Sequence, residues 1–254
     1  MSRIPNLLLT VVATLIFSSF AIAQNTLPLN TGFDHSSGTP YSIGVQDNYW
    51  INIASFPPSA PVAPTGSWVI LKHPLWAAPF ANTQWISART TFTSASGTNP
   101  SNPAYVIFRK CFCLQPGFTT PSLSLSVRGD DNIEIWLNTI TNEVLDSTPG
   151  NSGSLSSPIL ATHTAGFVQG RNCLYVLLED TFFGATGLNL QGTVSARGSL
   201  LIAQGVAVSF APCNCLSGPL PTEDKEAVES RISDQDEQII REILEIREAR
   251  RRNK

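Results

Sequence analysis

Hydrophobic and polar residues alternate in short stretches through most of the chain, a pattern typical of β-strands with one buried face. A representative stretch is NIEIWLN (132–138), in which aliphatic residues occupy every second position. Clusters of Gly, Pro, Ser and Asn, such as ASGTNPSNP and STPGNSGSLSSP, separate these stretches and indicate turns. The pattern therefore predicts an all-β body that forms a sandwich or a barrel.

Two alternating stretches flank the sequence RGDDN (128–132), with SLSLSV before it and IEIWLN after it. Because Gly, Asp and Asn tolerate turn conformations, we expect a β-hairpin with RGDDN at its tip. The tripeptide Arg128-Gly129-Asp130 is also an adhesion motif when it lies on an exposed loop tip. The turn explains these residues without adhesion.

Helical periodicity replaces the alternation near residue 219. Thr222 and the acids after it suit a helix start, and the basic residues from Arg250 onward suit a helix end. A charged amphipathic helix is therefore predicted over 219–254. Its apolar stripe contains Val228, Ile232, Ile239, Ile243 and Ile246. The stripe could dock on the β body or on another protein, or pair with a second copy as a coiled coil, unless the helix stays solvated.

The first 23 residues carry one basic residue and an apolar run, and they end in the small-x-small pattern Ala21-Ile22-Ala23. This is typical of a secretory signal peptide, so we expect cleavage before Gln24 and export to the periplasm or the extracellular space. No later segment is apolar enough to predict a membrane span. The expected organisation is a signal peptide over 1–23, a β body over 24–218 and the helix over 219–254.

The charge balance narrows the classes of partner. The chain has 16 basic and 19 acidic residues, which gives a formal net charge of −3. Nothing in that balance favours nucleic acid or an anionic membrane. A glycan or a protein surface is the expected kind of partner, with a second copy of the chain as an alternative.

The chain contains five cysteines, and four of them form two Cys-x-Cys pairs. In an exported protein these pairs favour disulfides that join the strand near residue 112 to the segment near residue 214. Their connectivity is open, and a zinc site is the alternative. Cys173 is then left over, as a buried thiol or an intermolecular link. The four paired candidates are Cys111, Cys113, Cys213 and Cys215.

A series of motifs carries a resemblance to a known kind of module. They are NTGFDHSSG, GVQDNYW, QWI, YVIFRKCFCL, DDNIEIWLN, QGRNCLYVLLED and TGLNLQG. In this order they resemble secreted bacterial jelly-roll modules, which are similar to galactose-binding-like domains and often occur on PEP-CTERM-sorted extracellular proteins. The resemblance implies an antiparallel two-sheet jelly-roll β-sandwich over 24–218 that binds glycans or surfaces. The apolar C-terminal span of a PEP-CTERM signal is not seen in this chain.

Four residues are candidate ligand contacts. Trp76 lies in HPLWAAPF, a loop with flanking prolines where an exposed indole could stack on a sugar. The other candidates are Trp50, Asp131 and Asn132, although aromatic residues in strands more often pack in a core.

The sequence predicts no cofactor, with calcium as the alternative because sandwiches of this kind often hold one ion. Its candidate ligands are Asp34, Asp47, Asp130, Asp131 and Asp180. A calcium ion needs about six to eight oxygen ligands, and no contiguous calcium loop is present. The alternative is that these side chains cap their own turns.

Signatures of catalysis are missing from the sequence. None of His35, His73 and His163 lies in a G-x-S-x-G or H-E-x-x-H motif. Glu134, Glu179 and Asp180 would form a glycosidase pair only if the fold brought them together. We therefore predict a non-catalytic binding or surface-structural module. A structural subunit linked through its helix and a glycan-active enzyme are the alternatives.

Overall fold

The computed structural model describes residues 24–56, 65–92, 104–147, 157–180, 184–198, 200–202 and 233–252. The predicted signal peptide, Val228, Ile232, Cys213 and Cys215 lie outside these residues. The strands are β1 (Gln24–Pro28), β2 (Phe33–Asp34), β3 (Thr39–Pro40), β4 (Gln46–Phe56), β5 (Thr65–Val69), β6 (Ile86–Ser87), β7 (Ala104–Leu114), β8 (Thr119–Asp130), β9 (Asn132–Leu137), β10 (Glu143–Asp146), β11 (Ile159–His163), β12 (Gly170–Asp180), β13 (Gly187–Arg197) and β14 (Leu200–Ile202), and the helix is α2 (Asp234–Arg252).

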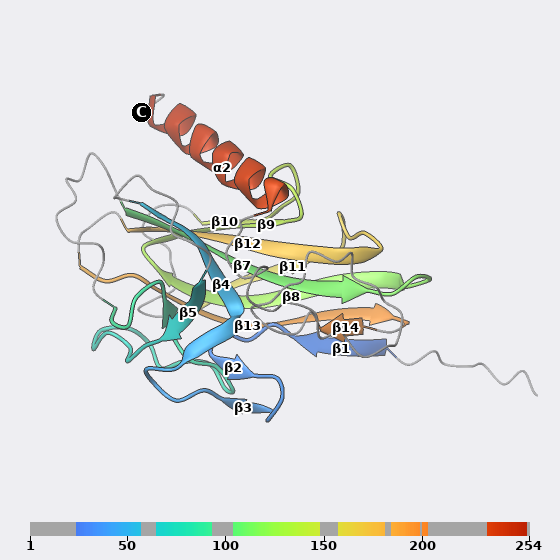
Figure 1. The fold of residues 1–254 in the computed structure, drawn as a ribbon, viewed down its shortest axis with the longest axis horizontal. Coiled ribbons are helices and arrows are strands. Elements are labelled where there is room, and N and C mark those ends of the chain that lie inside the picture. The colour runs from blue at the N-terminus through green and yellow to red at the C-terminus, as the bar shows by residue number, and fades with distance from the viewer. Residues whose placement is uncertain are drawn as a thin grey trace, which may run out of the picture.

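The strands form two antiparallel layers that join at one edge into a near-barrel (Figure 1). One layer has the order β10-β9-β12-β7-β4, and the other contains β6, β13, β8 and β11, with β5 linking β4 to β6. In addition, β1 pairs with β13, β14 pairs with β7, and β2 and β3 form a small separate sheet. The prediction of an all-β antiparallel sandwich with a C-terminal helix is confirmed.

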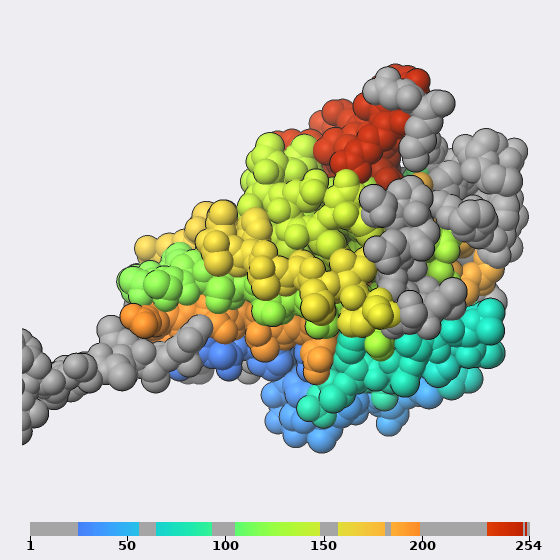
Figure 2. Space-filling view, turned by 180° about the vertical axis from the view of Figure 1, so that it is seen from behind, coloured from blue at the N-terminus to red at the C-terminus, as the bar shows by residue number. Residues whose placement is uncertain are grey.

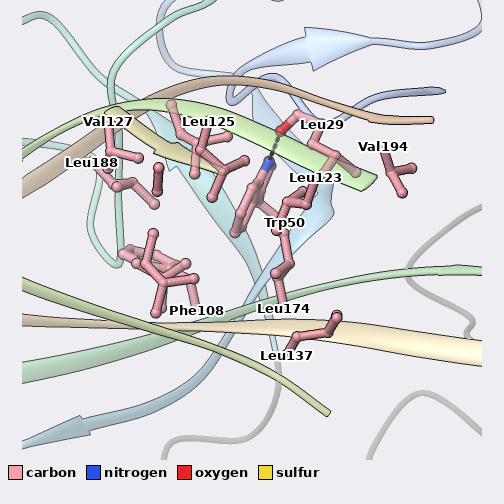
Figure 3. Close-up of a cluster of buried hydrophobic side chains, with 14 of the residues drawn as sticks. Leu29, Trp50, Phe108, Leu123, Leu125, Val127, Leu137, Leu174, Leu188 and Val194 are labelled. Carbon is pink, nitrogen blue, oxygen red and sulfur yellow. Dashed lines mark hydrogen bonds between the residues drawn. The ribbon is translucent and has the colours of Figure 1, made fainter. Parts of the chain in front are cut away.

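The space between the layers is filled by aliphatic and aromatic side chains from both of them (Figure 3). Trp50 lies among them and is completely buried. Its indole Nε1 donates hydrogen bonds to the carbonyl oxygens of Leu29 at 3.1 Å and Asn30 at 3.2 Å. Because its N–H is satisfied, this large side chain can be buried without an unpaired donor.

The helix α2 covers the outer face of the layer that contains β4, β7, β12 and β9 (Figure 1). Ile239, Ile240 and Ile243 are buried there, and Leu244 packs against the same cluster. Of the alternatives for the apolar stripe, the described residues show docking on the β body. The sandwich side of this contact consists of Ile51, Ile53, Ala54, Tyr105, Ile107, Cys111, Trp136, Cys173, Tyr175 and Leu177.

Charged side chains hold both ends of α2. In the first turn, Asp236 forms a buried ion pair with Arg109 and accepts a 3.0 Å hydrogen bond from the hydroxyl of Tyr175. Ser233 caps the helix, since its Oγ accepts a 3.1 Å hydrogen bond from the backbone N–H of Asp236. The described part of the predicted helix therefore begins at Asp234.

The other end of α2 is held by arginines. Arg247 and Arg250 bind Glu134 at 2.6 Å and 2.9 Å, and Arg247 also pairs with Glu179. No helix within the described residues has both the length and the apolarity needed to cross a membrane.

The predicted hairpin at RGDDN is wrong. The strand β8 pairs with β13 and β11, whereas β9 pairs with β12 and β10, so the chain passes here from one layer to the other. Gly129 is required at this crossing because a Cβ atom there would lie 2.7 Å from Ile133 and 2.8 Å from Leu178. Arg128 donates to the carbonyl oxygen of Ala78 at 2.6 Å.

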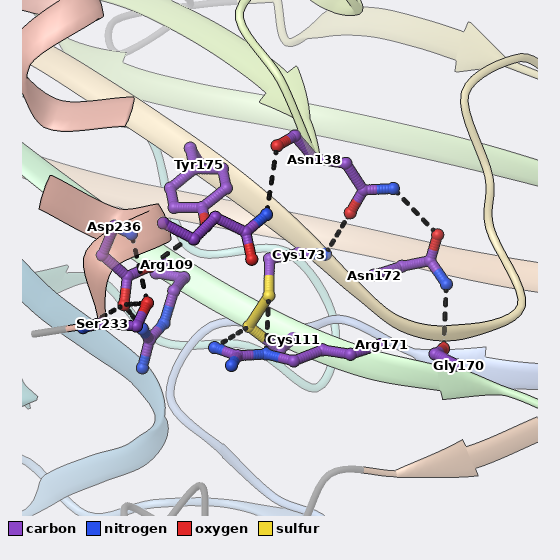
Figure 4. The surroundings of a disulfide bond; sticks show 11 residues. Arg109, Cys111, Asn138, Gly170, Arg171, Asn172, Cys173, Tyr175, Ser233 and Asp236 are labelled. Carbon is purple, nitrogen blue, oxygen red and sulfur yellow. Dashed lines mark hydrogen bonds and ion pairs between the residues drawn. A yellow bond between two sulfur atoms is a disulfide. The ribbon is translucent and has the colours of Figure 1, made fainter. Parts of the chain in front are cut away.

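The disulfides differ from the prediction in one respect, the partner of Cys111. Cys111 is bonded to Cys173, its direct cross-strand neighbour between β7 and β12, so Cys173 is not left over (Figure 4). Cys113 is disulfide-bonded as well. A zinc site built from these thiols is therefore excluded. The sequence could not show this connectivity because it did not reveal that β7 and β12 are neighbours.

We predict that Ile239→Asp will release α2 from the sandwich. A buried carboxylate without a partner should cost at least about 2 kcal/mol of docking free energy. Circular dichroism and limited proteolysis should show loss of helix and cleavage near α2, while the β-sheet signal remains. Glu245→Ala, a change at an exposed position of the same helix, is the control and should alter neither signal. A variant that keeps its helicity and its protease resistance would contradict the docking.

We also predict that peptide mapping without reductant will recover a fragment joining Cys111 to Cys173. A second fragment should join Cys113 to the peptide that contains Cys213 and Cys215, because these are the remaining cysteines. Replacing both Cys111 and Cys173 by Ser should lower the free energy of unfolding by about 2 to 5 kcal/mol. Recovery of free thiols at both positions would refute the assignment.

Candidate functional site

The structure buries most of the predicted ligand contacts. Trp76 is only 3% exposed, since its ring stacks on Trp85 with centroids 4.3 Å apart, and its Nε1 donates to Asp130 Oδ2 at 2.8 Å. The expectation of an exposed indole is therefore wrong. Trp50 is enclosed in the core, and Asn132 is 5% exposed with its amide donating to Glu179 at 3.0 Å. Asp131 is the one member of the predicted set that is half-buried.

The candidate calcium ligands do not form a common site. Within the described residues, no three His, Cys, Asp or Glu side chains are grouped so that they could hold a metal ion. Asp34 accepts hydrogen bonds from the N–H and hydroxyl of Ser36 at 2.8 and 2.6 Å, as the turn-capping alternative predicts. Asp180 lies 3.4 Å from the hydroxyl of Thr186. Burial and the neighbouring Asp131 raise the pKa of Asp130 to about 8.

Of the three carboxylates considered for glycoside hydrolysis, the fold brings Glu134 and Glu179 together, where they share one arginine. Both bind Arg247 under α2. Asp180 follows Glu179 in the same strand, so its side chain points to the opposite face. These residues serve the docking of the helix and the packing of the sandwich.

Aromatic side chains gather where the small β2–β3 sheet meets the start of β4. We call Phe33, His35, Tyr41 and Tyr49 the aromatic cluster. The ring of His35 lies 4.5 Å from that of Tyr49 and 5.2 Å from that of Phe33, in both cases edge to face. His35, Tyr41 and Tyr49 are half-buried. Within the described residues, neither tyrosine hydroxyl makes a hydrogen bond.

Lys110 lies beneath this cluster and is only 3% exposed. Its Nζ is 2.8 Å from His35 Nε2 and lies 5.3 and 5.7 Å from the ring centroids of Tyr49 and Trp50. Burial lowers the pKa of Lys110 to about 8, although nearby Asp47 favours the charged form. Burial also lowers the pKa of His35 to about 3, so the imidazole is neutral and its Nε2 can accept a hydrogen bond from the lysine.

Asp47 fixes the backbone around the cluster. It is completely buried, and it accepts hydrogen bonds from the backbone N–H groups of Gly32 at 2.6 Å, Tyr49 at 2.9 Å and Trp50 at 3.2 Å. Gly32 has a φ of +59°, and a Cβ atom there would lie 2.5 Å from Gln84, which explains the glycine. One carboxylate thus ties the segment before β2 to the start of β4, and so positions Tyr49.

Two carboxylates set the electrostatic surroundings of the tyrosines. Hydrogen bonds from Ser36 and Ser37 lower the pKa of Asp34 to about 2, so it is ionised at neutral pH. Burial raises the pKa of both Tyr41 and Tyr49, and the negative charges of Asp34 and Asp47 raise it further by a smaller amount. The two phenols therefore stay protonated and can both donate and accept hydrogen bonds.

A change of partner strand along β7 explains how Lys110 reaches the cluster. The register of β7 with β4 ends at Arg109, and its register with β14 begins at Phe112. Lys110 lies between these two pairings. Sequence reasoning missed Tyr41, Tyr49 and Lys110 as site residues. The available signals were a lysine inside the apolar run YVIFRKCFCL and two tyrosines placed close after Asp34 and Asp47.

Comparisons with known proteins do not assign the chain to a family. No family model matches it, and no curated protein matches it. Similar solved structures include a PA14 sugar-binding domain from an RTX adhesin, at 22% identity and TM-score 0.27. The match covers 39% of this chain and 50% of the PA14 chain. A family 35 carbohydrate-binding module from Clostridium thermocellum matches at 11% identity and TM-score 0.30, over 59% of this chain and 95% of that one. A family 29 carbohydrate-binding module matches at 10% identity and TM-score 0.30, over 70% and 94%.

The charge state of Lys110 predicts a rise in stability at alkaline pH. The folded protein holds this lysine with a pKa of about 8, below its ordinary value of 10.5. Between these values the unfolded chain binds more protons, so the free energy of unfolding increases with pH, by about 3 kcal/mol at most. Chemical denaturation across this window should show the increase in the wild type and a flatter profile in Lys110→Met. Parallel profiles would refute a buried titrating lysine.

Proposed function

We propose that this protein is a non-catalytic module that binds carbohydrate through the aromatic cluster. The observation that carries the proposal is the pair of half-buried tyrosines, Tyr41 and Tyr49, whose hydroxyls are unpaired within the described residues. A pyranose has an apolar face of C–H groups that packs on aromatic rings, and its hydroxyls need polar partners at the ring edges. Tyrosine supplies both kinds of contact in one side chain.

The support around the cluster also favours binding. His35 is held between Lys110 and the ring of Tyr49, and Asp47 fixes the backbone of Tyr49. A site whose side chains are held before the ligand arrives loses less conformational entropy on binding. This matters for a sugar because each contact with a hydroxylated ligand is individually weak.

The remaining features fit a role outside the cell. The disulfide between Cys111 and Cys173 agrees with the predicted export, since such bonds persist in oxidising compartments. The carboxylates considered for catalysis are engaged under α2 or packed within the sandwich. A structural subunit linked through its helix has less support, because Ile239 and Ile243 pack on their own sandwich.

Tyr49→Ala should weaken glycan binding by about tenfold, because it removes a stacking surface and a hydroxyl together. A glycan array would first identify a binding sugar, and calorimetry would then compare the variants. Phe80→Ala, which removes a half-buried ring next to Arg128 that is not part of the aromatic cluster, is the matched control and should bind as the wild type does. If the wild type binds no glycan, or if both variants bind equally well, the proposal fails.

A further inference from the structure

Exposed apolar side chains gather on two neighbouring segments of the surface. Among the described residues, six large hydrophobic side chains are exposed, and four of them lie on the turn before β4 and on the loop after β5. These four are Ile43, Val45, Leu71 and Leu75, and we call them the apolar patch. A single exposed leucine is ordinary, whereas a group of such side chains marks a binding surface.

Backbone hydrogen bonds hold the two segments side by side. The N–H of Gly44 donates to the carbonyl oxygen of Val69 at 2.8 Å, and the N–H of Val69 donates to the carbonyl oxygen of Val45 at 2.9 Å. Leu71 follows Val69 by only two residues, and Leu75 is 71% exposed in the turn that comes next. β5 and the loop after it lie on the side of the sandwich away from α2, so the docked helix leaves them accessible (Figure 2).

The loop that carries Leu75 pairs its own backbone groups. The ammonium group of Lys72 donates to the carbonyl oxygen of Trp76 at 2.9 Å. It also reaches the carbonyl oxygens of His73 and Pro74, both at 3.4 Å. The N–H of Leu75 donates to Nδ1 of His73 at 3.3 Å, and the N–H of Trp76 donates to the carbonyl oxygen of His73 at 3.0 Å. The backbone at the tip of this loop is therefore largely paired within the loop itself.

Such internal pairing favours a lipid surface as the partner. Water would satisfy these backbone groups at an ordinary surface, and a protein partner would bring hydrogen-bond donors and acceptors of its own. The apolar part of a bilayer offers neither, so a loop that enters it must pair its backbone groups internally.

The charges near the apolar patch are also compatible with a lipid surface. No aspartate or glutamate occurs in the sequence between Asp47, which is buried, and Asp130. The phosphate groups of a bilayer therefore meet no carboxylate from this part of the chain. The formal net charge of −3 gives no general attraction to an anionic membrane, so binding would depend on the apolar side chains.

We propose that the apolar patch binds the surface of a lipid bilayer, with its four side chains inserted at the boundary between headgroups and acyl chains. Lys72 keeps the carbonyl oxygens of the inserted loop paired, and its positive charge suits the phosphate groups. Binding of this kind is weak and reversible, because only a few side chains leave water. The apolar patch shares no residue with the aromatic cluster, so this contact is additional to the proposed glycan binding.

Cosedimentation with vesicles of phosphatidylcholine, a lipid without net charge, tests the proposal on the protein exported without its predicted signal peptide. The wild type should sediment with the vesicles, and it should do so at least as well at about 1 M salt as at about 0.1 M, because salt does not screen apolar insertion. Leu75→Ser should lower the partition coefficient about tenfold, the effect of returning one leucine side chain to water. Leu71→Ser should have an effect of similar size.

Leu160→Ser is the matched control, because Leu160 is also 71% exposed but lies in β11, outside the apolar patch. It should bind as the wild type does. All three variants change exposed positions, so circular dichroism should show the wild-type fold for each. A wild type that stays in the supernatant would overturn the proposal, as would binding that is lost at high salt or that Leu160→Ser weakens as much as Leu75→Ser does. Light scattering that finds a dimer for the wild type and a monomer for Leu75→Ser would also overturn it, by assigning the patch to a contact between copies.

Discussion

The pairing of β7 with β12 is the constraint on which the rest of the structure depends. Their register runs without a break from Leu114 opposite Gly170 to Ala104 opposite Asp180. Both faces of this strand pair are covered, one by the sandwich core and the other by α2. Because successive side chains of a strand point to opposite faces, neighbouring residues of β7 take on different roles.

Three consecutive residues show this division. Arg109 anchors α2 on the outer face, Lys110 meets His35 on the inner face, and Cys111 is bonded to Cys173 on the outer face again. A shift of one residue in register would exchange these faces, so the helix contact, the candidate site and the disulfide all rest on one alignment. The β2–β3 sheet, which carries part of the aromatic cluster, and α2 lie on opposite sides of the sandwich in the views from the front and the back (Figures 1 and 2). A glycan bound at the proposed site would therefore not compete with the docked helix for space.

The sequence pattern predicted the strands and the amphipathic helix well, because alternation and helical period report which face of an element is buried. The pattern does not show which other element packs against the buried face, and the wrong predictions depended on that information. The alternation on either side of RGDDN is real, yet it holds equally for a hairpin and for a chain that crosses between layers. Likewise, Trp76 lies in a proline-flanked loop, and tertiary contacts such as its stacking on Trp85 bury it. The aromatic cluster escaped prediction for the same reason, since Lys110 is far in sequence from the residues it supports.

Apolar and charged contacts have different roles in the docking of α2. The isoleucines supply the buried apolar area, but a stripe of similar side chains would fit in either direction. Buried ion pairs add little net stability, because desolvation offsets much of their attraction. Their effect is on orientation: Asp236 meets Arg109, and 11 residues further along, about 16 Å on a helix, Arg247 meets Glu134. A reversed helix would place Arg247 at Arg109 and Asp236 at Glu134. Each end would then bury two like charges, so electrostatics rather than shape excludes that arrangement.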